Sequence, residues 1–215
     1  MTNTSPNQKQ QLRKKFLDLR SNLPAARKNQ ADAAICKHLQ IFFSGKFFTS
    51  PIGGKVRRIA AYLNSAPEAS VDAWITYAWQ QSQLQVFIPV LDQQQKGHMS
   101  FRGHHKNSKT TIGRYGLRTL AEPKTTEQID AADLDCVLLP LVAFDKYGTR
   151  LGMGGGYYDR FFANQTNRPY LLGISFDAQK SQQILDRSHW DVGLDAVITE
   201  SGLTEFGARE FGGSK

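Results

Sequence analysis

The longest apolar run in the sequence is CVLLPLVAF, from Cys136 to Phe144. A continuous run of this kind is typical of a central strand that is covered on both faces, as in a parallel sheet. Further strands are predicted at 57–63, 85–89, 170–176 and 195–199, with a short one at 99–102. Helical patterns lie between most of them. This alternation predicts an α/β sheet with helices on both faces.

The predicted helices follow from apolar spacing and capping residues. Leu12, Phe16, Leu19 and Leu23 recur at helical intervals, and Pro24 suits the first turn of a second helix. Further helices are expected after Ser70, over YYDRFFAN (157–164), and at 178–185. The region 92–126 is polar and is expected to be mainly loops.

Positive charge is concentrated in the first part of the chain. Residues 1–58 carry twelve lysine and arginine side chains but only two acids, whereas the whole chain has a net charge of +8. A basic segment suggests an anionic partner, such as a nucleotide, a polyanionic substrate or a nucleic acid, and charge alone does not choose among them. Lys14, Lys15 and Arg20 are expected to be solvated surface residues.

Length and composition indicate one domain. The 215 residues are 40% hydrophobic, enough for a substantial core. We expect a disordered tail at 1–8, a single domain at 9–200 and a frayed tail at 201–215. Because no apolar stretch has the roughly 20 residues of a membrane span and no signal peptide is evident, the chain is predicted to be cytoplasmic, without membrane contact. Two isolated cysteines, Cys36 and Cys136, suggest neither a disulfide framework nor a zinc site.

A cluster of four glycines, Gly152 and Gly154–Gly156, lies between the apolar strand and a helix. Glycines there let backbone N–H groups approach phosphate oxygens, and the helix N-terminus adds a positive dipole. Arg150 could contact phosphate directly, and Asp159 could hold Mg²⁺ beside it. The spacing fits neither a P-loop nor a dinucleotide fingerprint. A tight structural turn, followed by an exposed aromatic pair, is the simpler alternative.

The surrounding segment resembles the C-terminal signature of the 5-formyltetrahydrofolate cyclo-ligase family, FDxxGxRLGxGxGYYDR. The matching residues run from Phe144 to Arg160. Three shorter pieces occur in the family's order: KxxLR at Lys9, Leu12 and Arg13; a leucine and glutamate at Leu63 and Glu68; and a late aspartate at Asp191. On residue type alone, Glu68 would be an exposed loop carboxylate.

The resemblance implies a three-layer α/β/α sandwich around a mostly parallel, Rossmann-like sheet. It also implies ATP-dependent conversion of 5-formyltetrahydrofolate to 5,10-methenyltetrahydrofolate, with release of ADP and phosphate through an N5-iminium phosphate. Arg150 and Tyr157 would be catalytic, Leu63, Glu68 and Tyr157 would bind the folate, and Asp159 and Asp191 would bind Mg²⁺. The implied ATP-binding residues are Lys9, Gln10, Gln11, Leu12, Arg13, Arg150, Leu151, Gly152, Met153, Gly154, Gly155, Gly156, Tyr157 and Tyr158.

The chain departs from the family pattern in the glycine cluster and in one loop. Some relatives place Arg and Lys where this chain has Met153 and Gly155, so either Arg150, Lys9 and Arg13 suffice for phosphate or the affinity is lower. The loop 113–123 is longer than the family's segment, and no site residue is assigned to it. The basic N-terminal segment suits a polyglutamylated folate.

The partners expected are therefore small molecules, without nucleic acid, and the protein is expected to be a monomer. Two other functions are weighed. A sugar-phosphate or CoA-type enzyme can use a similar scaffold, since fold alone does not fix function. A nucleic-acid-binding protein is suggested only by the basic charge and aromatic content, because no RRM, KH or zinc-finger signature is present.

Overall fold

The computed structural model describes residues 6–44, 57–163, 165 and 167–207. Its centre is an eight-stranded sheet in the order β12-β11-β10-β7-β1-β2-β3-β6, with five parallel strands in the middle and antiparallel strands at both edges. The strands are β1 (Arg57–Ala60), β2 (Leu84–Leu91), β3 (Met99–Gly103), β6 (Gln128–Ile129), β7 (Cys136–Pro140), β10 (Tyr170–Ile174), β11 (Ala196–Thr199) and β12 (Gly202–Glu205). The predicted mostly parallel sheet is confirmed.

The order of strands reverses between β1 and β7. From β1 the chain moves outward to β2 and β3 on one side, then returns to β7 and continues outward through β10 and β11 on the other. β1 and β7 pair in parallel, with Ile59 beside Cys136 and Ala60 beside Val137. In open α/β sheets, a reversal of this kind leaves a crevice outside the carboxyl ends of the strands, where ligands bind.

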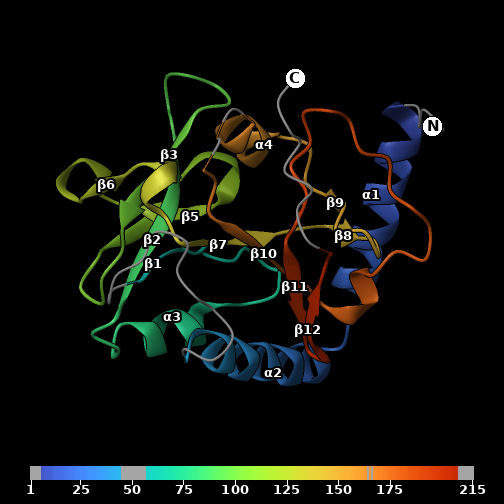
Figure 1. Cartoon of the computed structure of the whole chain (residues 1–215), viewed down its shortest axis with the longest axis horizontal. Helices are drawn as coiled ribbons and strands as arrows, with labels where there is room; N and C mark the ends of the chain where they lie inside the picture. The colour runs from blue at the N-terminus through green and yellow to red at the C-terminus, as the bar shows by residue number, and fades with distance from the viewer. Residues whose placement is uncertain (1–5, 45–56, 164, 166, 208–215) are drawn as a thin grey trace.

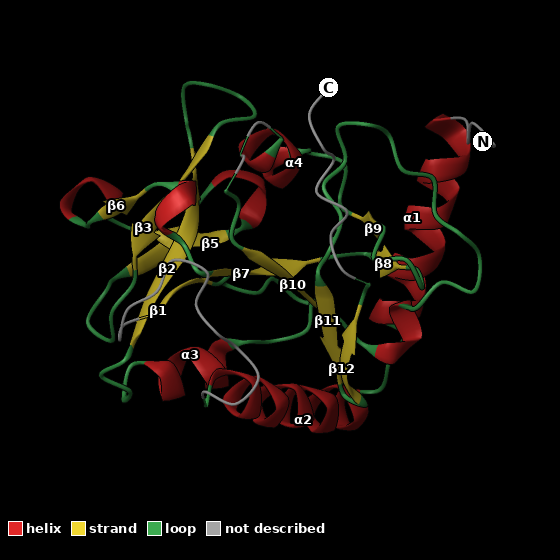
Figure 2. Cartoon of the chain, viewed as in Figure 1, coloured by secondary structure: helices red, strands yellow, loops and turns green. Residues whose placement is uncertain are grey.

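Helices flank both faces of the sheet (Figure 1). α2 (Ala25–Phe43) and α3 (Asp72–Ala78) cover one face, and α4 (Tyr157–Phe162) lies on the other. α1 (Pro6–Ser21) instead packs on the small antiparallel pair β8 (Ala143–Phe144) and β9 (Arg150–Leu151), away from α2 and α3 (Figure 2). The second helical layer is therefore thin, and loop segments complete it.

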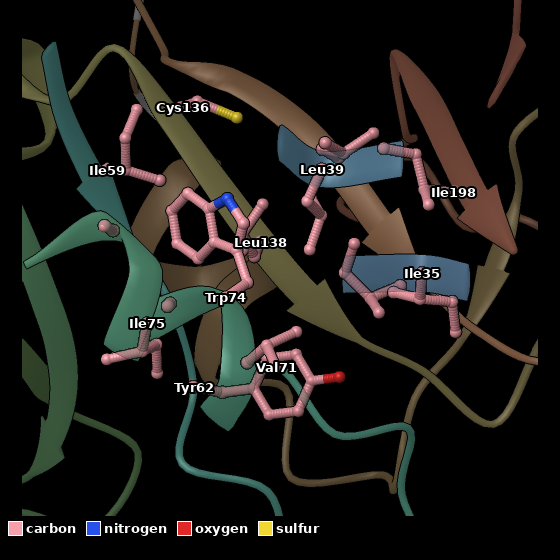
Figure 3. Packing of buried hydrophobic residues seen from close by; sticks show 14 of the residues in the cluster. Ile35, Leu39, Ile59, Tyr62, Val71, Trp74, Ile75, Cys136, Leu138 and Ile198 are labelled. Atoms are coloured by element: carbon pink, nitrogen blue, oxygen red, sulfur yellow. The ribbon is translucent and has the colours of Figure 1, made fainter. Parts of the chain in front are cut away.

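The core confirms that the central strand is covered on both faces. Cys136 and Leu138 belong to the cluster under α2 and α3, whereas Val137 and Leu139 belong to the cluster under α4. This is the two-residue alternation of a strand. Figure 3 shows the fully buried Trp74 of α3 between Ile59 of β1 and Leu138 of β7. The apolar stripe of α3 is thus core, as its spacing predicts.

The apolar run is not one strand. β7 ends at Pro140, and the chain turns at Leu141 and Val142 before β8 pairs with β9. The turn is held by buried donors, because the Gln179 side chain donates to both carbonyls at 2.8 and 2.9 Å. Arg20 also donates to the Leu141 carbonyl at 3.2 Å. The bend directs the following glycine-rich segment over the ends of the strands.

The predicted helix at 178–185 is wrong. Only a 3-10 turn forms, η4 (Asp177–Gln179), because the Gln179 side chain is engaged with the carbonyls after β7 and with the Phe176 N–H. The chain then runs without helix to Leu185, whose N–H donates to Asp145. Three other 3-10 turns are η1 (Arg114–Gly116), η2 (Pro123–Thr125) and η3 (Ala131–Asp133).

Both expected tails contain regular structure. α1 begins at Pro6, inside the segment 1–8, and β12 lies inside the segment 201–215, where it pairs with β11 from Gly202 to Glu205. Phe206 follows and packs against Phe144. Residues 1–5 and 208–215 lie outside the described residues. The loop-rich region 92–126 also contains a hairpin of β4 (Thr110–Ile112) and β5 (Arg118–Leu120).

The buried face of α1 differs from the prediction at two positions. Leu19 is 43% exposed, whereas Arg20, expected at the surface, is 3% exposed. The buried line therefore runs through Leu12 and Phe16 to Arg20, at intervals of four residues. Arg20 is accommodated there because the bend after β7 supplies a carbonyl acceptor.

Candidate active site

A cavity of about 1250 Å³ opens at the carboxyl ends of the central strands. Leu63 follows β1 and Leu141 follows β7, so the cavity lies where the strand order reverses. The remaining walls come from α1, the end of β2, the β4–β5 hairpin, the glycine cluster and the segment 186–191. This is the location expected for the ligand site of an open α/β sheet.

The glycine cluster forms an open loop at the start of α4, which we call the glycine loop (Gly152–Gly156). Gly154 and Gly156 have φ angles of 96° and 64°, values that favour glycine over residues with a Cβ. Gly156 is the N-cap of α4, and no side chain caps the helix. The loop therefore presents backbone, without side chains apart from Met153, to the cavity.

The first half of the signature builds the turn that carries this loop. Asp145 is fully buried, and its carboxylate accepts hydrogen bonds from the N–H groups of Tyr147, Thr149 and Leu185 at 2.9 Å each. Gly148 has a φ of 75°, and a Cβ there would approach the Leu194 carbonyl and the Phe206 ring to 2.8 Å. These two residues shape the β8–β9 connection, and neither lines the cavity.

The resemblance assigns five residues of α1 to ATP, and two of them line the cavity. Lys9 and Arg13 are four positions apart, lie on one helical face and line the cavity. Arg13 Nε donates to the Gly152 carbonyl at 2.9 Å, and its guanidinium lies beside Gly154. Gln10 and Gln11 are exposed and Leu12 packs toward Phe16, so the helix directs all three away from the cavity.

Arg150 and Asp159 form an ion pair at the edge of the cavity. Arg150 Nη2 and Asp159 Oδ1 are 2.8 Å apart, and only 7% of the Arg150 side chain is exposed. Arg150 Nη1 donates to the Val192 carbonyl, and the Val192 N–H donates to Asp159 Oδ1 at 3.1 Å. Asp159 does not cap its own helix. The pair instead joins the start of α4 to the segment before β11.

Asp191 lies on the same segment and faces α1. Its Oδ2 is 3.7 Å from Lys9 Nζ and accepts a hydrogen bond from the Ser188 N–H at 2.8 Å. Asp159 and Asp191 each keep one carboxylate oxygen with no recorded hydrogen bond among the described residues. No cluster of three or more metal-ligating side chains occurs within those residues. Two carboxylates that line the same cavity as the glycine loop do fit Mg²⁺, which is commonly bound by one or two carboxylates with phosphate and water.

Glu68 and Leu63 line the part of the cavity after β1. Glu68 Oε2 accepts a hydrogen bond from the Ser65 N–H at 2.9 Å. Burial raises the pKa of Glu68, although that hydrogen bond and the charge of Arg20 act in the opposite direction. Burial, and then the charge of Glu68, also raise the pKa of Tyr158. Glu68 is therefore a half-buried carboxylate in the cavity wall and not the exposed loop residue that its type suggests.

Tyr157 lies beside the tip of the β4–β5 hairpin. Its hydroxyl is enclosed near Tyr115 without meeting hydrogen-bond geometry, and its contact with Tyr115 raises the pKa of Tyr157. Tyr115 itself has a φ of 60° and is 61% exposed. No residue of the hairpin was assigned from the sequence, yet Arg114, Tyr115 and Arg118 line the cavity. The sequence signal that could have identified this hairpin is Tyr115, a large aromatic residue in a polar loop.

Comparison with known sequences settles the family. The sequence model of the 5-formyltetrahydrofolate cyclo-ligase family matches residues 5–200. The chain belongs to this family. Two curated cyclo-ligases are each 32% identical to it: the Haemophilus influenzae protein over 193 residues, covering 88% of this chain and 96% of that relative, and the Escherichia coli K12 protein over 164 residues, covering 75% and 87%.

Two solved structures share the cyclo-ligase fold. The 5,10-methenyltetrahydrofolate synthetase of Mycoplasma pneumoniae is 27% identical and matches with a TM-score of 0.68, covering 89% of this chain and 98% of its own. The Aquifex aeolicus synthetase is 24% identical, with a TM-score of 0.75 over 94% and 95% of the chains, and supports the fold alone. Within the described part of the chain, no helix combines the length and hydrophobicity needed to cross a bilayer.

Proposed function

We propose that this cyclo-ligase binds ATP on the glycine loop and 5-formyltetrahydrofolate beside Leu63 and Glu68, within the one cavity. The reaction of the family is the ATP-dependent closure of 5-formyltetrahydrofolate to 5,10-methenyltetrahydrofolate. The observation that carries the assignment of sites is that a single cavity is lined both by the glycine loop with Lys9 and Arg13 and by Leu63 and Glu68.

Charge supports this arrangement. Seven lysine and arginine side chains line the cavity against four acids. Both substrates are anions, ATP through its phosphates and the folate through its glutamate, so a surplus of positive charge favours both. Arg13 is well placed for phosphate, because its Nε is already bound to Gly152 and its guanidinium faces Gly154. No lysine is needed inside the glycine loop for this contact.

The chemistry proceeds in two steps. The N5-formyl oxygen attacks the γ-phosphorus of ATP and ADP leaves, which converts a poor leaving group into a phosphate ester on an iminium carbon. N10 then attacks that carbon, its proton passes to solvent or to the departing phosphate, and phosphate leaves, which gives the methenyl bridge. Phosphoryl transfer depends mainly on positioning and on neutralising charge. Lys9, Arg13 and the glycine-loop N–H groups would supply both functions for the phosphates.

Arg150 and Tyr157, predicted to be catalytic, take more specific proposed roles. Arg150 is bound to Asp159 and to the Val192 carbonyl, so we propose that it holds Asp159 in place as well as adding positive charge. Tyr157 lies at the boundary between the glycine loop and the hairpin, where it would contact the folate. Asp159 and Asp191 would hold Mg²⁺, which would neutralise phosphate charge.

One assay tests the function. Mixing the protein with MgATP and 5-formyltetrahydrofolate should produce the absorbance of the methenyl product, and omission of either ATP or the divalent metal should abolish it. Equal product without ATP would contradict the ligase reaction. The Arg13→Ala variant should weaken ATP binding, since a charge-assisted hydrogen bond contributes about 1.5–3 kcal/mol. A cytoplasmic monomer stays a prediction from the sequence, to be tested by sedimentation and cell fractionation.

A further inference from the structure

Arg160 joins two loops that come from different sides of the cavity. Its Nε donates to the Gly97 carbonyl at 3.1 Å, and its Nη2 donates to the Gly155 carbonyl. Gly97 lies in the turn between β2 and β3, while Gly155 belongs to the glycine loop. The two acceptors are backbone oxygens, and among the described residues Arg160 forms no ion pair with an acid.

The two loops are shaped around this guanidinium. A Cβ at Gly97 would lie 2.9 Å from Arg160 Nε and Nη2, and a Cβ at Gly156 would lie 2.8 Å from Nη1. Both distances are shorter than real Cβ contacts, so a side chain at either glycine would displace the arginine. The guanidinium also lies 5.5 Å from the centre of the Tyr157 ring, within the range of a cation–π contact.

We propose that Arg160 is a positioning residue that holds the glycine loop in its phosphate-binding form. In a trans peptide, the C=O of one residue and the N–H of the next point in opposite directions. Holding the Gly155 carbonyl toward Arg160 therefore turns the Gly156 N–H to the other side of the same peptide. Arg13 acts in the same way on the Gly152 carbonyl, and thus on the Met153 N–H.

The hydrogen bond from Arg160 to the Gly97 carbonyl ties the glycine loop to the turn between β2 and β3. Gly97 and its neighbours Lys96 and Met99 line the cavity, as does the end of β2. Arg160 therefore sets the separation between the glycine loop and the β2–β3 side of the cavity. The inference rests on the proposed nucleotide site, because the glycine loop must bind ATP for its order to affect ATP affinity.

Substitution of Arg160 separates positioning from direct charge. Arg160→Ala should raise the Kd for ATP by roughly tenfold, the size expected for losing one or two hydrogen bonds, and change the Kd for 5-formyltetrahydrofolate much less. Arg160→Lys should weaken ATP binding nearly as much, because an ammonium cannot span the two carbonyls as the planar guanidinium does. If Arg160→Lys kept the affinity of the unsubstituted protein, the residue would act by charge and the proposal would fail.

Gly97→Ala provides an independent test, because it displaces the guanidinium while leaving Arg160 in the chain. It should weaken ATP binding in the presence of Arg160 and add little to Arg160→Ala, whereas independent, multiplicative losses would overturn the proposal. Gly202→Ala controls for backbone strain: its φ is 126°, and the nearest atom is 3.9 Å away, on His38. Arg27→Ala, on the exposed surface of α2, controls for loss of a positive charge.

Amide hydrogen exchange gives a readout of the loop itself. In Arg160→Ala, exchange at Gly152–Gly156 should become faster without ATP, while exchange in β7 and β10 should not change. Arg13→Ala distinguishes failure of the positioning role of Arg160 from failure of the proposed nucleotide site. Weaker ATP binding in Arg13→Ala but not in Arg160→Ala would refute the positioning role and leave the nucleotide site standing. Unchanged ATP binding in both would refute the site as well.

Discussion

Glu68 is a carboxylate in a place that disfavours its charge. Burial raises its pKa, and the neighbouring hydroxyls of Tyr62 and Tyr158 are buried beside it. A carboxyl whose pKa is raised on folding contributes stability that is present below the unfolded pKa and is lost as the pH rises through the folded pKa. Glu68 therefore lowers the stability of the protein at neutral pH, while it places an ionisable group in the cavity where we propose that folate binds.

We predict that Glu68→Gln has a higher Tm than the unsubstituted protein at pH 7.5 and lower activity. The difference in Tm should shrink as the pH falls toward about 4.3, the ordinary pKa of glutamate, because the unsubstituted side chain is then protonated as well. Thermal unfolding from pH 4 to pH 8 measures this. A difference that stayed constant across that range would show that the charge of Glu68 is not the cause.

Asp159 forms the ion pair with Arg150 and is also a proposed Mg²⁺ ligand, and substitution can separate the two roles. Asp159→Asn can still accept both hydrogen bonds at Oδ1, but it leaves the charge of the mostly buried Arg150 uncompensated. We expect the Tm to fall by roughly 2–8 °C. The loss of stability should be about 1–2 kcal/mol, and each kcal/mol shifts the Tm of a domain of this size by about 2–4 °C. The Mg²⁺ concentration for half-maximal activity should rise several-fold.

Asp191→Asn should shift the Mg²⁺ requirement with a smaller loss of stability, because its ion pair with Lys9 is longer and more exposed. Asp18→Asn, on the exposed face of α1, is the matched control. If the magnesium titrations of both variants overlaid that of the control, neither aspartate would be a Mg²⁺ ligand as proposed.

At this scale, sequence motifs located the site better than they assigned its contacts. Lys9, Arg13, Leu63, Glu68 and the glycine loop all line one cavity. A contiguous motif could not separate Lys9 and Arg13 from the three residues between them, because helix geometry alone decides which side chains face inward. Nor could residue type show that Arg20 is buried, since its carbonyl acceptor is 121 positions away.

At the scale of elements, the edge strand β12 shows where local pattern is insufficient. Its residues, GLTE, have little hydrophobic periodicity, and three of the four are exposed. The strand forms because β11 offers an unpaired edge and a tight turn returns the chain to it. The bend after β7 and the short turn η4 likewise depend on Gln179, a polar residue whose partners are distant in the sequence.

We predict that a chain ending at Glu200 is markedly less stable than one ending at Gly207. The shorter chain loses the pairing of β12 with β11 and the packing of Phe206 on Phe144. A loss of about 2–3 kcal/mol would lower the Tm by roughly 5–10 °C, as differential scanning calorimetry would show. Equal melting of the two chains would mean that β12 contributes little, while the longer chain controls for removal of 208–215.

At the scale of the molecule, the alternation of strands and helices was sufficient to predict the sheet, and the reversal of strand order explains the position of the cavity. The layer of helices above that cavity was harder to predict. α4 has only six residues and shares its face of the sheet with loops such as 192–194, where Val192 and Leu194 pack in the core but follow no hydrophobic period. The sequence also did not predict that the β4–β5 hairpin forms a wall of the cavity, because the hairpin likewise follows no hydrophobic period.

The distribution of charge leads to a prediction for the whole molecule. The positive surplus around the cavity should attract both anionic substrates over a distance that salt shortens, from about 30 Å at 0.01 M to about 8 Å at 0.15 M. The KM for ATP should therefore rise several-fold between these ionic strengths, with a smaller change in kcat. In Arg13→Ala, the KM for ATP should depend less steeply on ionic strength. A KM that did not change with salt would argue against long-range attraction by the cavity.

The hydrogen bond from Arg13 to the Gly152 carbonyl has a consequence for how the protein is made. Its two residues are 139 positions apart, so the ribosome completes α1 long before its partner exists. At about 5–20 residues per second, that interval is roughly 7–28 s. During it, a 16-residue helix is marginal by itself, since helices of this length depend on tertiary packing. Capacity to bind nucleotide should therefore arise late, when the last third of the nascent chain has emerged.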